Sequence, residues 1–317
     1  MNTDNASGKV KGRFAPSPSG RMHIGNIYAA VMSWLSAKRR GGKWVLRIED
    51  LDPQRSKMEY ARMIEDDLLW LGLEWDEGGL DGIGDSGPYL QSLRHDIYGH
   101  FLSILKDTGF CYRCRCTRAD IMATRAPHES DGRVVYKGTC RPPVLPSPYV
   151  EGAGAVRIAV PDETIEFTDR ICGKQRVNLA GHCGDFVLRR ADGAWAYQFA
   201  VVVDDALMGI TEVVRGSDLL LSAAQQIYLY RLLGFAPPEF AHLPLICNDA
   251  GVRLSKRDSS LSMEYLRAHR SAEEILGNIA FRAKIIERDY PISLPELLEI
   301  TKKMSNFATQ NDKPPVK

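Results

Sequence analysis

The first third of the chain alternates short apolar runs with segments in which apolar residues recur every three or four positions. The short runs indicate strands, and the longer periodic segments indicate amphipathic helices. We predict a strand over 9–14, a helix beginning at Ile24, a second strand over 44–50 and a second helix from Ser56 to Gly72. This order is the opening of a parallel, doubly wound sheet, in which ligands bind at the carboxyl ends of the strands.

The middle of the chain, over 111–184, departs from this alternation. Prolines, cysteines and short β-like runs predict an insertion there. The sheet pattern resumes at 195–216, which predicts strand, tight turn and strand, and an apolar helix is predicted at 219–234. Two further helices are predicted near the end of the chain, at 271–286 and 294–304.

Domain boundaries follow from these changes of pattern. We predict an α/β fold with a doubly wound parallel sheet, whose first half spans 9–110 and whose second half spans 185–247. The insertion at 111–184 would form a subdomain of its own. Residues 248–317 would form a loop and a short helical tail.

Composition describes an ordinary globular protein, with 44% apolar residues, a mean hydropathy of −0.24 and a formal net charge of +1. Such a balance neither demands nor excludes a nucleic-acid partner. No run of about 18 apolar residues predicts a membrane span, and the N-terminus lacks the apolar core of a secretory signal. The seven cysteines, an odd number, favour thiols or a metal site in a reducing compartment. We therefore expect a cytoplasmic protein without a membrane partner.

The segment GRFAPSPSGRMHIGN, residues 12–26, lies where the first predicted strand meets the first helix. Glycine lets a ligand approach the backbone, and the free N–H groups of a helix start favour anionic oxygen. A second loop, GVRLSKRDSS at 251–260, carries Arg253, Lys256 and Arg257 around a serine. Each segment alone is also typical of a capped helix or a solvated basic turn. Together they indicate a phosphate-binding site.

These two segments resemble the HIGH and KMSKS elements of class I aminoacyl-tRNA synthetases. They stand here as His23-Ile24-Gly25-Asn26 and Arg253-Leu254-Ser255-Lys256-Arg257. The stretches LRIEDLDPQRS, YLQSLRHDIY and YQFAVVVDDALMGITEVVRGSDLL extend the resemblance to the glutamyl-tRNA synthetase family over most of residues 12–258. Asn26 departs from the last histidine of HIGH, and Arg253 and Arg257 depart from the first lysine and last serine of KMSKS. The lysine at 256 is retained.

The resemblance implies a Rossmann-like catalytic domain that activates an amino acid with ATP. ATP would be bound, together with Mg²⁺, by His23, Gly25, Asn26 and Lys256, with His23 and Lys256 as the catalytic residues. The carboxylate of the amino acid attacks the α-phosphorus, pyrophosphate leaves, and an RNA hydroxyl then accepts the acyl group. Such a reaction depends on positioning and charge stabilisation rather than on a side-chain nucleophile.

The amino-acid pocket implied by the same resemblance suits glutamate. It consists of Arg13, Ser17, Glu49, Tyr197 and Arg215. A guanidinium pairs with a carboxylate through two hydrogen bonds, and a carboxylate can hold the amino group. We favour Arg215 for the side-chain carboxylate of glutamate and Arg13 for the α-carboxylate. Each of these residues alone could equally form a structural ion pair.

Cysteines in the predicted insertion indicate a structural metal site. The segments CYRCRC and YKGTC bring soft thiolates from two short stretches into a loop-rich region, as structural zinc sites do. The family implies zinc held by Cys114, Cys116, Tyr136 and Cys140. A four-thiolate set with Cys111 in place of the tyrosine is chemically as reasonable, and buried or free thiols are the alternative without a metal. The remaining cysteines are interpreted as structural: Cys172, Cys183 and Cys247.

The RNA partner follows from the resemblance and not from the charges. The stretch after Lys256 is too short for the helical domain with which longer members read the anticodon, so we expect no such domain. A shortened branch of the family attaches glutamate to queuosine in the anticodon of tRNA(Asp), and we expect this activity in a monomer. The alternatives are a shortened synthetase that charges the 3′ end of tRNA and a catalytically silent RNA-binding relative. Four arginines could follow a phosphate backbone or form a solvated face: Arg113, Arg115, Arg118 and Arg141.

Overall fold

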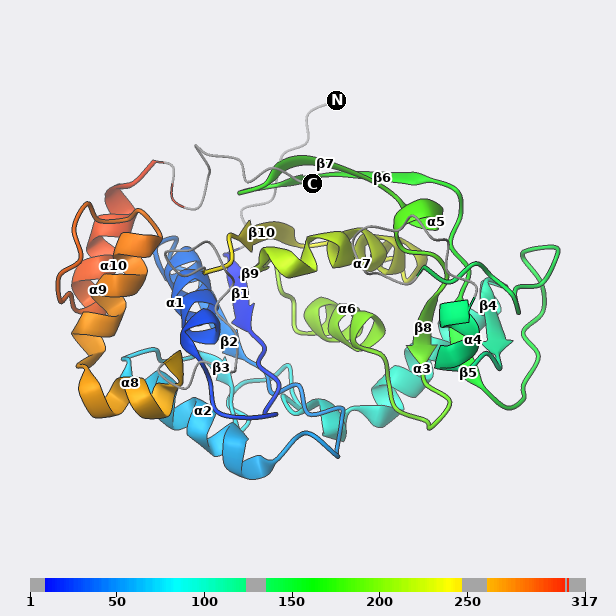
Figure 1. Cartoon of the computed structure of the whole chain (residues 1–317), viewed down its shortest axis with the longest axis horizontal. Helices are drawn as coiled ribbons and strands as arrows, with labels where there is room; N and C mark the ends of the chain where they lie inside the picture. The colour runs from blue at the N-terminus through cyan, green and yellow to red at the C-terminus, as the bar shows by residue number, and fades with distance from the viewer. Residues whose placement is uncertain (1–8, 124–134, 247–260, 306, 308–317) are drawn as a thin grey trace.

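A five-stranded parallel sheet forms the centre of the molecule (Figure 1). The structure, a computed structural model, describes residues 9–123, 135–246, 261–305 and 307. The strand order is β10-β9-β1-β2-β3, and every neighbouring pair is parallel. The strands are β1 (Lys11–Phe14), β2 (Lys43–Leu46), β3 (Glu77–Gly78), β9 (Glu212–Gly216) and β10 (Glu239–Leu243).

Helices cover both faces of this sheet, which confirms the predicted doubly wound α/β fold. Because strand side chains alternate between faces, Trp44 and Leu46 enter one apolar core and Val45 enters the other. The first core is completed by α1 (Ile24–Lys38), α2 (Met58–Trp70) and the C-terminal helices. The second contains α3 (His95–Asp107), α6 (Tyr197–Leu207) and α7 (Leu220–Leu232).

Most predicted elements of the sheet domain are found, with shifted ends. The first strand and first helix are confirmed, whereas β2 ends at Leu46 and α2 begins at Met58 instead of Ser56. The helix predicted at 219–234 is confirmed as α7, preceded by the 3₁₀ turn η2 (Ser217–Leu219).

The prediction of strand, turn and strand over 195–216 is wrong in its first half. Residues Tyr197–Leu207 form helix α6, and only Glu212–Gly216 form a strand. The run Val201–Val203 is buried on every side, so no polar stripe marks it as helical. A short, continuously apolar run is typical of a buried helix as well as of a buried strand. Here the β-branched valines favoured the strand prediction.

The inserted region carries its own antiparallel sheet, in the order β4-β5-β8 (Figure 1). Its strands are β4 (Cys111–Cys114), β5 (Ala155–Ile158) and β8 (Phe186–Arg189), and its short helices are α4 (Arg118–Ala123) and α5 (Leu179–His182). Because β8 pairs with β5, this sheet continues past residue 184, where the sequence was divided. The predicted division into four segments remains a prediction.

A long hairpin leaves the insertion and returns to the central sheet. It consists of β6 (Thr164–Asp169) and β7 (Gly173–Asn178), which pair along their whole length. Strand β6 contacts β10 and α7, so the hairpin runs along the molecule from the small sheet to the edge of the large one (Figure 1).

Three helices close the end of the molecule opposite the insertion (Figure 1). They are α8 (Met263–His269), α9 (Ala272–Arg282) and α10 (Leu294–Lys303). The two helices predicted near the end of the chain are confirmed as α9 and α10, and α8 was not predicted. Another 3₁₀ turn, η1 (Gln91–Leu93), precedes α3. Among the described residues, no helix combines the length and apolarity needed to cross a bilayer.

The packing of α9 generates a stability prediction. A Cβ atom built on Gly277 would lie 1.9 Å from the carbonyl oxygen of Tyr290, whereas one on Gly99 in α3 would have no neighbour within 4 Å. Gly99→Ala should raise the free energy of unfolding by about 0.5–1 kcal/mol, because alanine is the better helix former. Gly277→Ala should lower it by about 1–3 kcal/mol through the backbone clash. Chemical denaturation measures both, and equal stabilisation would contradict the close contact.

Candidate active site

A cavity of about 440 Å³ lies beyond the carboxyl ends of the first two strands. Ser17 follows β1 and Glu49 follows β2, and both line the cavity together with Tyr197 at the start of α6. Three of the five residues predicted for the glutamate pocket are therefore brought together. The remaining polar and aromatic lining residues are Ser19, Asp52, Arg55, Ser56, Gln91, Arg190 and Trp195.

A buried group of charges supports the wall of this cavity. Arg47 has no exposed surface, and its guanidinium donates to Asp205 at 2.7 Å and to Glu49 at 3.1 Å. Arg13, the fourth predicted pocket residue, pairs with the same Asp205 at 3.4 Å. The carboxylate of Asp205 thus joins the end of β1 to the segment after β2 through a residue of α6.

The neighbouring Asp204 extends these contacts to α3. Its carboxylate accepts from Arg94 at 2.7 Å, from the amide of Gln91 at 2.7 Å and from the hydroxyl of Tyr98 at 2.9 Å. Asp204 is completely buried, so each of these donors replaces a hydrogen bond to water. Arg47 lies 3.7 Å from it and connects the two aspartates.

The surroundings shift the pKa values of the buried carboxyls in opposite directions. Burial alone would raise the pKa of Asp205, but Arg47 and Arg13 outweigh it and lower the pKa. For Glu49 burial is dominant and raises the pKa, although Arg47 and Arg13 oppose it. Glu49 therefore gains more than Asp205 from an added cation, which is the role that an amino group of a substrate would fill.

The fifth predicted residue, Arg215, is held by its neighbours on the sheet. Its Nε donates to Nε2 of His242 at 3.0 Å, and its Nη2 lies 3.4 Å from the carbonyl oxygen of Leu219. Its buried Nη1 has no hydrogen-bond partner among the described residues. Burial lowers the pKa of Arg215, which the nearby Tyr197 opposes.

Of the residues predicted to bind ATP, three lie at the start of α1. Nδ1 of His23 accepts from the backbone N–H of Gly25 at 3.1 Å, and the side chain of Asn26 accepts from the backbone N–H of His23 at 3.1 Å. This reciprocal capping box is a structural role that the sequence had left open. Because Nδ1 accepts a hydrogen bond, the proton of the neutral ring lies on Nε2. Lys256 lies outside the described residues.

Several residues of the site were not predicted. Arg47, Asp204 and Asp205 complete the buried charges, and Asp169 and His242 support Arg215. The available signal was local, since Arg47 follows the apolar run WVL and the two aspartates follow three valines. A charge inside a buried apolar segment needs a partner, and that requirement could have identified the first three.

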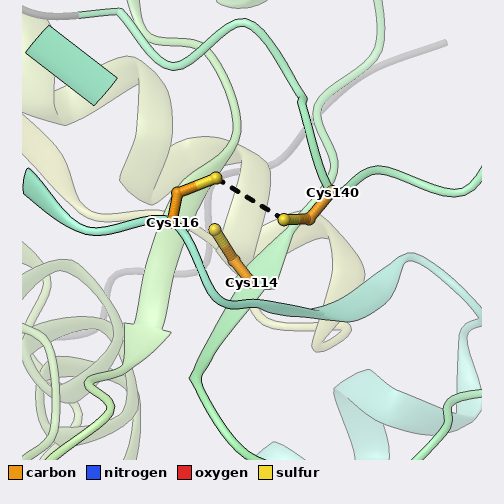
Figure 2. Close-up of side chains that lie close together, drawn as sticks. All are labelled: Cys114, Cys116 and Cys140. Carbon is orange, nitrogen blue, oxygen red and sulfur yellow. Dashed lines mark hydrogen bonds between the residues drawn. The ribbon is translucent and has the colours of Figure 1, made fainter. Parts of the chain in front are cut away.

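The inserted region gathers three of its cysteines at one point (Figure 2). The sulfur atoms of Cys114, Cys116 and Cys140 all lie within 4.8 Å of one another. The hydroxyl of Tyr136 lies 3.4 Å from the sulfur of Cys114 and 3.7 Å from that of Cys116. The structure therefore brings together all four predicted metal ligands in an arrangement suited to a metal ion.

Cys111, the alternative fourth ligand, is not part of this cluster. It lies three positions before Cys114 on β4, so the two side chains leave opposite faces of the strand. Cys111 packs in the core of α3 and α6, where burial raises the pKa of its thiol to about 12. Within the cluster, burial alone would raise the pKa of Cys140, but hydrogen bonds from the Arg115 backbone and the Tyr136 hydroxyl lower it to about 7. An easily formed thiolate suits metal binding.

The parallel sheet, the capped helix after its first strand and the cavity at the strand ends define the catalytic domain of a class I aminoacyl-tRNA synthetase. Over residues 9–289 the sequence matches the family described as tRNA synthetases class I (E and Q), catalytic domain. It is 46% identical over 297 residues to the glutamyl-Q tRNA(Asp) synthetase of Symbiobacterium thermophilum, a match that covers 91% of each chain. The chain belongs to this family, in the branch of the glutamyl-Q tRNA(Asp) synthetases, which confirms the resemblance seen in its sequence.

Longer relatives are similar over part of their length. A glutamate–tRNA ligase of a Sulfurihydrogenibium strain is 43% identical over 261 residues, which span 80% of this chain and 54% of that protein. The structure of a glutamate tRNA ligase from Elizabethkingia meningosepticum, in complex with its amino acid, superposes with a TM-score of 0.81 at 31% identity, over 96% of this chain and 66% of that one. The fold of the present chain is thus that of the catalytic part of these enzymes.

The capped start of α1 generates a prediction for Gly25→Ala. A Cβ atom there would lie 2.9 Å from Cε1 of His23, so the ring must leave its place above the helix start. We expect glutamate-dependent exchange of pyrophosphate into ATP to fall by about 100-fold, because catalysis depends on the position of that ring. Gly99→Ala, in open space on α3, is the matched control and should keep its exchange rate. Normal exchange in Gly25→Ala would show that the ring position is unimportant.

Proposed function

We propose that the protein activates L-glutamate with ATP and transfers the glutamyl group to queuosine in the anticodon of tRNA(Asp). The support for the acceptor is the similarity to a glutamyl-Q tRNA(Asp) synthetase over 91% of both chains. The observation that carries the choice of amino acid is the buried group of charges behind the cavity. ATP, glutamate and the tRNA would meet in the cytoplasm.

The charges beneath the cavity favour an amino acid with two carboxylates. Four guanidinium groups lie around three carboxylates: those of Arg13, Arg47, Arg94 and Arg215 around those of Glu49, Asp204 and Asp205. Arg215 has no directly paired carboxylate among the described residues, because the buried Asp169 reaches it only through the ring of His242. The side-chain carboxylate of glutamate can supply that pair. The uncharged amide of glutamine would leave a buried guanidinium poorly paired.

Each part of glutamate has a partner in this arrangement. The Nη1 of Arg215, which has no hydrogen-bond partner in the described part of the chain, suits the side-chain carboxylate, and Arg13 suits the α-carboxylate. Glu49 receives the ammonium group, while Ser17 and Tyr197 line the same cavity and orient the ligand. The assignment of the two arginines is the one favoured from the sequence.

Adenylate formation then needs ATP beside the α-carboxylate. The proton on Nε2 of His23 and the backbone N–H groups after it would contact the phosphates, with Gly25 and Asn26 shaping the helix start. Lys256 would contact the triphosphate. Mg²⁺, bound with ATP, would neutralise charge on the phosphates. The α-carboxylate oxygen attacks the α-phosphorus, the bond to the bridging oxygen breaks, and pyrophosphate leaves.

Part of the cavity remains for the acceptor. Its lining also includes Arg55 and Arg190, two exposed cations. An unstacked nucleotide of an anticodon loop can enter such a cavity and present a hydroxyl group to the adenylate. The hydroxyl oxygen attacks the acyl carbon, AMP leaves with the bonding electrons, and the proton passes to the departing phosphate or to solvent. As expected from the sequence, the protein would act as a monomer.

The cysteine cluster would hold a structural zinc ion. Tetrahedral coordination with Zn–S bonds of about 2.3 Å places sulfur atoms about 3.8 Å apart. The three thiols, all within 4.8 Å of one another, need only small movements to reach that geometry. Tyr136 would supply the fourth ligand atom, and it also accepts the backbone N–H of Cys140 at 2.7 Å. The ion would fix the loops of the insertion, away from the cavity where ATP binds.

The proposed activity is tested in two stages. Pyrophosphate exchange should proceed with glutamate and ATP alone, because the glutamate-binding groups and the start of α1 lie in one body, and glutamine should not replace glutamate. Labelled glutamate should then appear on tRNA(Asp) that carries queuosine and not on the same tRNA with guanosine. Exchange that strictly requires tRNA(Glu), or equal transfer to both forms of tRNA(Asp), would favour a synthetase that charges the 3′ end. Absence of exchange would indicate a catalytically silent RNA-binding protein.

The zinc site generates a separate prediction. Cys140→Ser should lower the zinc content and loosen the insertion, so transfer to tRNA should suffer more than pyrophosphate exchange. Cys183→Ser, a half-buried cysteine of the same region outside the cluster, is the matched control and should keep its zinc. Elemental analysis of protein purified without chelator measures the metal directly. A wild-type protein free of zinc would contradict the site.

A further inference from the structure

A buried chain of three polar side chains ends at Arg215. Arg215 on β9 and His242 on β10 are register partners in the parallel sheet, and Nε of the arginine donates to Nε2 of the histidine at 3.0 Å. Nδ1 of the same ring lies 2.6 Å from a carboxylate oxygen of Asp169, the last residue of β6. Asp169 and His242 are at most 1% exposed and Arg215 is 6% exposed.

The chemistry of the three groups fixes the direction of both hydrogen bonds. The Nε of an arginine can only donate, so Nε2 of His242 must be the unprotonated acceptor. The ring proton therefore lies on Nδ1 and is donated to Asp169. The other oxygen of Asp169 accepts three backbone N–H groups, from Ile171, Cys172 and His242, at 2.8–3.2 Å. The carboxylate cannot turn away without leaving these donors unpaired.

The surroundings leave the guanidinium little freedom. Phe240 on β10 stacks with the His242 ring at a centroid distance of 6.0 Å, and the Arg215 guanidinium carbon lies 5.3 Å above the same phenyl ring. With Nε held by His242 and Nη2 directed at Leu219, the plane of the guanidinium is set. The group that remains without a partner among the described residues is Nη1.

We infer that Asp169 and His242 are positioning residues for amino-acid recognition. Asp169 holds the ring of His242 in one tautomer, and His242 thereby fixes the direction in which Arg215 meets a carboxylate. This inference rests on the proposed function, in which Arg215 binds the side-chain carboxylate of glutamate. It adds that the inserted hairpin β6–β7, and not the sheet domain alone, determines the affinity for the amino acid. Neither residue touches the substrate.

Asp169→Asn tests the tautomer. The amide can keep its oxygen on the three backbone N–H groups, but its NH₂ group then faces Nδ1 of His242 and moves the ring proton to Nε2. That proton would oppose the Nε–H of Arg215, so the guanidinium must turn. We expect the KM for glutamate in pyrophosphate exchange to rise at least about tenfold. The KM for ATP and kcat at saturating glutamate should stay within about twofold.

Asp185→Asn is the matched control. Asp185 is also a buried aspartate, and it accepts from the hydroxyl of Tyr112 at 2.6 Å and from the backbone N–H of Val160 at 2.8 Å, away from Arg215. Its glutamate KM should be unchanged. An equal rise of the glutamate KM in both variants would show a general effect of altering the core and overturn the inference.

A spectroscopic measurement keeps the test independent of variant stability. In wild-type protein with ¹⁵N-labelled histidine, the His242 ring should show a protonated Nδ1 and an unprotonated Nε2 at neutral pH, and Asp169→Asn should reverse this. A wild-type ring protonated on Nε2 would overturn the inference. Normal wild-type exchange with an unchanged glutamate KM in Asp169→Asn would do the same, whereas absence of wild-type exchange would refute the proposed function instead.

Discussion

The carboxylate of Asp205 is the contact on which the site is built. It receives Arg47 from the segment after β2 and Arg13 from β1, and it lies near the C-terminal end of helix α6. Burying such charges is costly, and removal of one member of a buried pair leaves an unmatched charge at a cost of about 3–5 kcal/mol. These buried ion pairs therefore favour a single arrangement of β1, β2 and α6. That arrangement also opens the cavity at the strand ends.

The same charges explain why a structural network can serve as a binding site. A guanidinium already paired with a carboxylate would gain little from a ligand, whereas Arg215 has no directly paired carboxylate among the described residues. The raised pKa of Glu49 and the Nη1 of Arg215, which has no hydrogen-bond partner within the described ranges, are two local signs of this incomplete pairing. In the proposed function, these charged groups are already held in place before the substrate binds. The free-energy cost of removing water from them has been offset during folding.

Sequence predicted the local elements well and the contacts between them poorly. Periodicity located α9 and α10, which keep an exposed polar face, whereas α1 and α7 are largely buried and were located by the length of their apolar segments. It failed at α6, where burial on every side removes that face. The two cysteine segments predicted a metal site, and the family resemblance implied its four ligands, but only the strand geometry of β4 separates Cys111 from the cluster. Arg47 and His242 depend on partners more than 100 and about 70 residues away in sequence, which no local pattern reveals.

The hairpin β6–β7 connects the inserted region to the central sheet. Asp169 belongs to the inserted region by its place in the chain, yet it sits against β10 of the central sheet. With Asp169 in its proposed positioning role, the insertion is not an independent module that could be exchanged between related enzymes while leaving amino-acid choice intact. A chimera that replaced residues 111–184 would also replace the anchor of His242. Engineering of the acceptor specificity in this architecture has to keep the hairpin of the original chain and change only the small sheet beyond it.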